Sequence, residues 1–190
     1  MNPGIDVHLF RVSPVVEKEI GFYPPEVQTY LAGKSGKERI RSQAAYSFLI
    51  EKCEERGMDP EFDFSGKPAL KNGFRFSLSH TDEYVAVAIA ECEVGIDIEK
   101  KSRPIAPRLY RTLSENEKKL CENDPGAFLK IWVKKEAYLK STGQGLRLRP
   151  EEVDTTALKN CLVFERGGLW IALCSEKNVD ESDVRVISDL

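Results

Sequence analysis

A short alternating segment, Val94-Gly-Ile-Asp-Ile-Glu99, constrains this chain more than any other part of its sequence. Its β-branched residues predict a β-strand, in which successive side chains point to opposite faces. Asp97 and Glu99 then lie on one face, and Ile96 and Ile98 lie on the other. Two carboxylates about 7 Å apart along a strand suit a hard divalent cation. The segment therefore predicts a strand with a metal-binding face.

A second segment, Trp132-Val-Lys-Lys-Glu-Ala-Tyr-Leu-Lys140, carries a third carboxylate, Glu136, with Lys140 one helical turn beyond it. Apolar residues recur at the helical period, which predicts a helix over 128–140. Glu136 and Lys140 fall within its apolar arc, where a buried charge needs a partner. This placement sets the two charges apart from ordinary surface residues.

The same two charges have a simpler interpretation. A Glu–Lys pair four residues apart is common on a solvated helix, where it contributes about 0.2–0.5 kcal/mol. Asp97 and Glu99 upstream favour a functional role instead. Gly143 is then expected to cap the end of the helix, and Gly145 is expected to keep the next turn open.

Three carboxylates and one lysine form the candidate catalytic group. Mg²⁺ held by a few carboxylates, with its other positions left to phosphate oxygens and water, is usual in phosphoryl-group chemistry. Asp97, Glu99 and Glu136 are the expected ligands, and Mn²⁺ is expected to replace Mg²⁺ because it also accepts oxygen ligands. Lys140 can neutralise phosphate charge or protonate a leaving oxygen. These residues predict a Mg²⁺-dependent enzyme that acts on a phosphate ester or a pyrophosphate.

The two segments together resemble the signature of 4′-phosphopantetheinyl transferases: Gly-Ile-Asp-Ile-Glu, then Trp-x-x-Lys-Glu-Ala-x-x-Lys-x-x-Gly-x-Gly-Leu. Gly66-Lys67-Pro68 and Phe76-Ser-Leu-Ser79-His80 are similar to two further segments of that family, so the resemblance covers about residues 35–150. It implies the larger, single-chain type, whose α+β fold has two pseudo-symmetric lobes with the active site between them. The lobes expected here are 1–93, on the nucleotide side, and 94–190, with the metal motif, acting as one catalytic unit.

The order of predicted elements agrees with two lobes. A helix over 37–55 precedes a hairpin over 74–90, and the second helix precedes a hairpin over 161–174. We therefore expect each lobe to be a helix packed on a small antiparallel sheet.

Composition limits the class of protein. Contents of 41% apolar and 31% charged residues are ordinary for a soluble globular protein, and neither a membrane-spanning run nor a signal-peptide pattern is present. The five cysteines are scattered without a CxxC pair, which predicts reduced thiols in a cytoplasm, with no disulfide and no zinc site. A net charge of −3 argues against a general nucleic-acid binder. We expect a cytoplasmic monomer that binds neither nucleic acid nor a membrane.

The resemblance implies coenzyme A as co-substrate and places its phosphates against the first lobe. Lys67 precedes a proline that stiffens the backbone, while Ser79 and His80 at a strand end can donate to phosphate oxygens. Arg41 and Ser42 match family positions that approach the same phosphates. His80 has a simpler interpretation, because a lone histidine at a strand end is usually solvated or caps a core. Arg41 and Ser42 could likewise belong to an ordinary cationic helix face.

Other basic residues are weaker candidates. Residues 24–31 lack the lysines or arginines expected before the first helix. Lys34, Lys37 and Arg39 follow and are candidates for contact with the 3′-phosphate. Lys135 is a further, weaker candidate for a phosphate contact.

The implied reaction transfers 4′-phosphopantetheine from coenzyme A to a serine of an apo acyl or peptidyl carrier protein and releases adenosine 3′,5′-bisphosphate. Glu136, directly or through a metal-bound water, would deprotonate the serine, and Lys140 would stabilise or protonate the departing phosphate. Two alternatives remain. One is an impaired relative that only binds coenzyme A or the carrier, and the other is a Mg²⁺-dependent pyrophosphohydrolase of nucleotides that uses water as nucleophile.

A basic and apolar strip follows the metal strand and is a candidate surface for an acidic carrier. Arg103, Arg108 and Arg111 alternate with apolar residues, and Ser114 with Glu117 forms a capping box that opens a helix. Such a strip can attract an acidic protein by charge and hold it by apolar contact. A solvated amphipathic face is the alternative.

Overall fold

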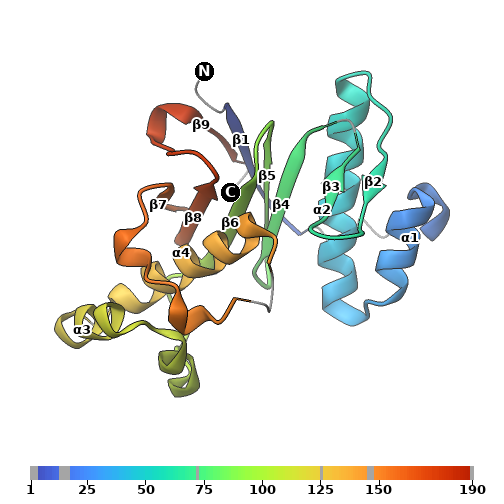
Figure 1. Ribbon diagram of the computed structural model, residues 1–190. Coiled ribbons are helices and arrows are strands. Elements are labelled where there is room, and N and C mark those ends of the chain that lie inside the picture. The colour runs from blue at the N-terminus through green and yellow to red at the C-terminus, as the bar shows by residue number, and fades with distance from the viewer. Residues whose placement is uncertain (1–3, 13–17, 72, 125, 145–147, 189–190) are drawn as a thin grey trace.

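The computed structural model describes residues 4–12, 18–71, 73–124, 126–144 and 148–188, which form a mixed α+β structure with two β-sheets (Figure 1). The helices are α1 (Pro25–Ala32), α2 (Gly36–Glu55), α3 (Glu115–Asn123) and α4 (Ala127–Thr142). The strands are β1 (Ile5–Arg11), β2 (Phe62–Asp63), β3 (Ala69–Leu70), β4 (Arg75–His80), β5 (Tyr84–Ala90), β6 (Val94–Lys100), β7 (Cys161–Arg166), β8 (Leu169–Ser175) and β9 (Val184–Ser188). Short 3-10 turns cover Ile20–Phe22, Pro107–Thr112, Pro150–Glu152, Thr155–Ala157 and Glu181–Asp183.

The larger sheet has the strand order β2-β3-β4-β5-β1-β9, and the smaller sheet has the order β6-β8-β7. Paired strands run antiparallel except β1 and β9, which run parallel. The β4–β5 hairpin turns at Thr81, as its polar residues predict, because the Thr81 hydroxyl accepts the N–H groups of Glu83 and Tyr84. β9 pairs with β1, so the larger sheet contains strands from both sides of the boundary expected at residue 93.

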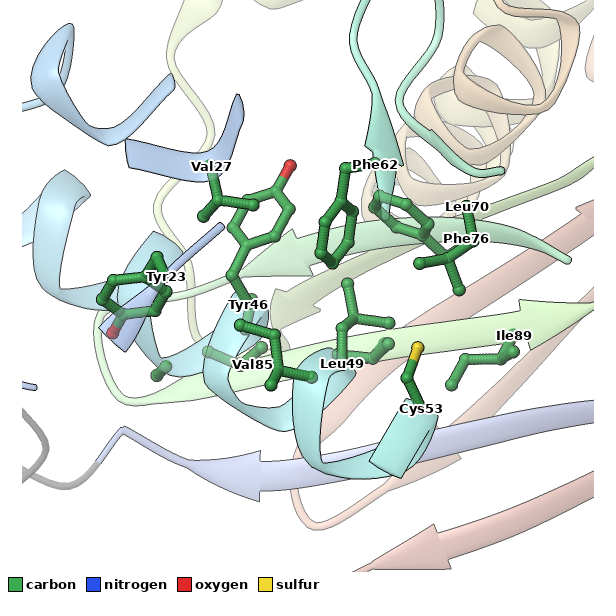
Figure 2. Close-up of a cluster of buried hydrophobic side chains, with 14 of the residues drawn as sticks. Tyr23, Val27, Tyr46, Leu49, Cys53, Phe62, Leu70, Phe76, Val85 and Ile89 are labelled. Carbon is green, nitrogen blue, oxygen red and sulfur yellow. The ribbon is translucent and has the colours of Figure 1, made fainter. Parts of the chain in front are cut away.

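One hydrophobic core lies between α2 and the larger sheet. Figure 2 shows aromatic side chains meeting there, with Tyr46 of α2 edge-on to Phe62 and Phe76 from the strands. Leu49 and Cys53 continue the same helix face into this core. The apolar side of α2 was expected from the helical period and is confirmed.

A second core fills the space between the two sheets. Ile96 and Ile98 of β6 pack there with Val7 of β1 and Ile171 of β8. The alternation that predicted opposite faces for the isoleucines and the carboxylates is confirmed for this strand. Because both sheets contribute to one core, the two halves of the chain are packed together tightly.

Helix α4 packs on the other face of the smaller sheet, where Val133 and Ala137 contact Ala172 of β8. Gly95 permits this close approach, since a Cβ atom there would lie 2.0 Å from the carbonyl oxygen of Ala137. The helix ends at Gly143 with φ 65°, which confirms the predicted cap; Gly145 lies outside the described residues.

The expected sequence of helix then hairpin is confirmed, with α2 before β4–β5 and α4 before β7–β8. The sheets themselves contain six and three strands, so the predicted pseudo-symmetry does not extend to their topology. None of the helices in the described ranges combines the length and apolar character needed to cross a membrane.

The prediction of five reduced cysteines is wrong. Cys161 and Cys174 lie opposite each other on β7 and β8, with Cα atoms 4.1 Å apart, and form a disulfide. Cys53, Cys92 and Cys121 are buried free thiols. The scattered spacing hid the pair because the hairpin brings together residues 13 positions apart. Cysteine usage therefore gives no support for a reducing compartment.

Candidate active site

A cavity of about 660 Å³ lies between α4 and the segments of the first half of the chain. Glu136 and Lys140 of α4 line one side, and Lys67 with its neighbours in the Gly66-Lys67-Pro68 loop lines another. Aromatic and aliphatic side chains complete much of the wall: Tyr30, Tyr46, Phe76, Leu78, Leu139 and Leu148. Residues from three of the sequence motifs thus line one cavity.

Asp97 lies beside this cavity wall and is only 6% exposed. Lys140 donates from Nζ to Asp97 Oδ1 at 2.7 Å and to the carbonyl oxygen of Ile96 at 3.1 Å. Ser79 donates from Oγ to the same Asp97 oxygen at 2.7 Å. Asp97 is therefore held by a hydroxyl from the larger sheet and a cation from α4.

The other two predicted carboxylates differ in their surroundings. Glu99 forms an ion pair with Arg103, one residue of the basic strip. Glu136 receives no hydrogen bond or ion pair from the other described residues. Burial raises the pKa of Glu136, and the nearby negative charge of Asp97 raises it further, while Lys140 and Arg103 oppose the change. Such a carboxyl is suited to accept a proton at neutral pH.

A divalent cation fits this group by charge and donor type. Within the described ranges, no set of three or more His, Cys, Asp or Glu side chains is arranged to hold a metal ion. Lys140 and Arg103 instead provide the positive charge for Asp97 and Glu99. Glu136 is half-buried and is destabilised as an anion next to Asp97, and a bound cation would relieve this destabilisation. Oxygen ligands of this kind suit Mg²⁺.

Lys67 is mostly buried and spans the two halves of the chain. Its Nζ donates to Glu93 Oε2 at 2.8 Å, to the Val94 carbonyl at 2.6 Å and, more weakly, to the Ser141 carbonyl at 3.5 Å. Burial lowers the pKa of Lys67, which Glu93 partly offsets. Glu93 also accepts from Arg75 at 2.7 Å. A phosphate would have to compete with Glu93 for this lysine.

Arg41 and His80 are brought together at a separate place. Arg41 contacts His80 Nδ1 at 3.3 Å and pairs with Asp82 at 2.9 Å. Burial, followed by the positive charge of Arg41, lowers the pKa of His80, which favours a neutral imidazole. Arg41 and Lys37 also line a second cavity of about 300 Å³. The corner formed by Arg41, Lys37 and His80 is a candidate for a terminal phosphate, which would have to compete with Asp82 for Arg41.

The remaining basic candidates are placed differently. Lys34, just before α2, pairs with Glu38 of that helix at 2.6 Å, and Arg39 is half-buried on the same helix. Ser42 is buried in α2 and lines neither of the two cavities. Their predicted roles toward coenzyme A remain predictions.

The structure contradicts the predicted phosphate contact of Lys135. Its side chain is 0% exposed and pairs with Glu117, itself 0% exposed, at 2.7 Å. Its other N–H groups donate to the carbonyl oxygens of Pro150 and Val153 at 2.7 and 2.6 Å. A lysine has three donors, so none is left for a phosphate. Lys135 instead fixes the 150–153 segment, which borders the larger cavity, against α4.

Glu117 has a larger role than its sequence indicated. The predicted capping box is confirmed, since Ser114 accepts from the Glu117 N–H and donates its own N–H to the Glu117 carboxylate. The same carboxylate accepts from the N–H and hydroxyl of Thr155 at 2.9 and 2.7 Å. The capping pattern gave no indication of the buried partner, Lys135.

Two functional-site residues were missed. Glu93 joins Lys67 to Arg75, and Ser77 accepts the Ile96 N–H at 3.0 Å. The available signal was the alternation of Arg75, Ser77 and Ser79 along β4, which places these polar side chains on one face. That face is turned toward β6.

The basic strip is largely accessible. Arg108 and Arg111 are exposed on the 3-10 turn Pro107–Thr112. Tyr110, 39% exposed, packs on Phe128 of α4 with ring centroids 4.8 Å apart. Arg103 differs from its neighbours because Glu99 holds it.

Comparison with known proteins gives a consistent result. Residues 93–178 match the family model described as the 4′-phosphopantetheinyl transferase superfamily. 4′-Phosphopantetheinyl transferase gsp of Aneurinibacillus migulanus is 35% identical over 86 residues, covering 43% of this chain and 36% of that protein. 4′-Phosphopantetheinyl transferase Sfp of Bacillus subtilis is 28% identical over 120 residues, covering 60% and 52%. The chain thus spans about half or less of these relatives. The matched residues 93–178 contain both the β6 and the α4 motifs, so the similarity to this superfamily includes the segments that carry the candidate site.

Proposed function

We propose that this protein transfers the 4′-phosphopantetheine group from coenzyme A to a serine hydroxyl of an apo carrier protein and releases adenosine 3′,5′-bisphosphate. One observation carries the proposal. Glu136 and Lys140 line a cavity large enough for an extended cofactor, with Asp97 bonded to Lys140 beside it. The named relatives are 4′-phosphopantetheinyl transferases, which supports the same reaction class.

The chain's residues have separate tasks in this reaction. Asp97, Glu99 and Glu136 would hold Mg²⁺, which supplies positive charge that stabilises the pyrophosphate as the bond breaks. Glu136, directly or through a water, takes the proton of the attacking serine. Lys140 turns from Asp97 toward the departing phosphate and stabilises its negative charge.

The two ends of coenzyme A would meet different parts of the chain. The corner of Arg41 and His80 takes a terminal phosphate, since its guanidinium and imidazole lie 3.3 Å apart and Arg41 lines the second cavity. Lys67 contributes positive charge at the cavity wall next to the C-terminal end of α4. The apolar stretch of the same wall, with Tyr46 and Phe76, accommodates less polar parts of the cofactor.

Incubation with coenzyme A, Mg²⁺ and a panel of apo carrier proteins tests the proposal, with intact-mass spectrometry of each carrier as the readout. We expect one carrier to gain the mass of one phosphopantetheine group. This gain should be absent in excess chelator and with the Glu136→Gln variant. No gain on any carrier would contradict it. Coenzyme A consumption without carrier would instead identify a pyrophosphohydrolase, and binding without turnover would identify a binding module.

A further inference from the structure

The two sheets are joined by serine side chains where a strand partner would otherwise lie. β6 pairs with β8 along one edge. On its other edge, the N–H groups of Ile96 and Ile98 donate to the hydroxyls of Ser77 and Ser79 on β4, at 3.0 and 3.2 Å. The two serines are separated by two positions and therefore lie on one face of β4.

These serines differ in one contact. Ser79 accepts the Ile98 N–H and also donates its own hydroxyl proton to Asp97 Oδ1 at 2.7 Å. Ser77 makes only the corresponding backbone contact among the hydrogen bonds of the described residues. Ser79 is 6% exposed and Ser77 is 5% exposed, so burial does not distinguish them.

The Ser79 contact determines which oxygen of Asp97 remains available. Ser79 and Lys140 both bond Oδ1, and no other described residue bonds Oδ2. Because the Ser79 hydroxyl is itself fixed by the Ile98 N–H, it holds the carboxylate in a single orientation relative to β6. Partners that orient a ligand in this way commonly set the affinity of a metal site.

We propose that Ser79 is a positioning residue whose hydroxyl orients Asp97 so that Oδ2 faces the divalent cation, and that it is not a ligand of the coenzyme A phosphates. This inference rests on the proposed function for its cation and deepens it. It also departs from the phosphate contact that the sequence resemblance implied for Ser79. Burial and two satisfied hydrogen bonds leave this hydroxyl without a donor for a phosphate.

Mn²⁺ is a suitable probe because it takes oxygen ligands and its free form is visible by electron paramagnetic resonance. The full chain is titrated with Mn²⁺ alone, as wild type, Ser79→Ala and Ser77→Ala. Each variant removes one acceptor for a β6 N–H, and Ser79→Ala also removes the hydroxyl that donates to Asp97, so both melting temperatures should fall, that of Ser79→Ala by more. Only Ser79→Ala should weaken Mn²⁺ binding, by roughly 10- to 100-fold.

Further measurements separate a positioning role from a structural one. Ser79→Thr, which keeps the hydroxyl, should restore Mn²⁺ affinity. In the transfer assay, Ser79→Ala should raise the KM for Mg²⁺ and leave the KM for coenzyme A unchanged. Equal loss of Mn²⁺ affinity in Ser77→Ala, or unchanged affinity in Ser79→Ala, would overturn the inference. Weaker coenzyme A binding with normal Mn²⁺ affinity would likewise overturn it and make Ser79 a phosphate ligand. Mn²⁺ binding is measured without turnover, so failure of the transfer reaction would be seen separately.

Discussion

Gly95→Ala tests whether the contact between β6 and α4 positions the site. A Cβ atom at residue 95 would lie 2.0 Å from the Ala137 carbonyl oxygen and 2.4 Å from the Ser141 nitrogen. Both are backbone atoms of α4, so neither can rotate away as a side chain can. A carbon–oxygen contact needs about 3.3 Å, which requires the helix to recede by about 1.3 Å from its present 2.0 Å approach.

This displacement has two measurable costs. Overpacking of a core costs about 1–3 kcal/mol in free energy of unfolding, equivalent to a decrease in Tm of about 2–12 °C for a chain of this size. The 2.7 Å contact between Lys140 and Asp97 would also lengthen beyond hydrogen-bonding range. A misplacement of about 1 Å at a reacting centre costs about 100-fold in rate, so we expect a similar loss in kcat/KM.

Thermal unfolding followed by circular dichroism and steady-state transfer kinetics measure the two effects. Gly21→Ala is the matched control, because no atom lies within 4 Å of a Cβ at that glycine. The control should retain both Tm and kcat/KM. If Gly95→Ala also retains both, the close packing does not position the site and the reasoning is refuted.

Three further predictions concern other parts of the molecule. Lys135→Met should lower the free energy of unfolding by about 3–5 kcal/mol in urea titrations, because Glu117 is left buried without its cation; weaker coenzyme A binding with unchanged stability would contradict this structural role. His8 is buried, with no partner for Nε2 among the described residues, and burial lowers its pKa, with Asp6 opposing and Lys52, Arg56 and Arg185 adding to the change. The stability that the neutral, buried His8 imidazole provides is therefore fully present above the unfolded-state pKa near 6.5. It is lost as the pH falls toward the lower pKa of the folded state. Urea unfolding across this range should show less loss of stability in His8→Phe than in wild type, and equal pH profiles would count against it. Arg108→Glu should raise the KM for an acidic carrier and flatten its salt dependence while leaving coenzyme A affinity unchanged; kinetics at low and high salt that match wild type would leave Arg108 as a solvated residue.

Local periodicity was sufficient to predict the elements that form the site. Alternation in β6 separated Ile96 and Ile98 from Asp97, and the helical period placed Glu136 and Lys140 on α4. Both patterns are local because burial of one face selects residues at a fixed spacing. Lys67 was identified from the family resemblance of its Gly-Lys-Pro segment and not from periodicity, and its partner Glu93 was not identified.

Contacts between residues that are far apart in the sequence could not be predicted from such local patterns. Lys135 and Lys140 share a motif, but five helical positions separate them by about 140° around α4. One therefore meets the buried Glu117 and the other meets Asp97. The Cys161–Cys174 disulfide and the Ser79 contact depend in the same way on which strands become neighbours.

The pairing of β9 with β1 has a consequence for the order in which the protein is made. Arg185 on β9 bonds Asp6 on β1 through two contacts of 3.0 Å, across a sequence separation of 179 residues. During synthesis from the N-terminus, β1 leaves the ribosome long before the strand that covers its edge. Until then its backbone groups on that side are open to pairing with other chains. The larger sheet can be completed only after almost all of residues 4–188 have emerged, so chaperones that shield a strand edge are expected to matter most for this protein while it is still nascent.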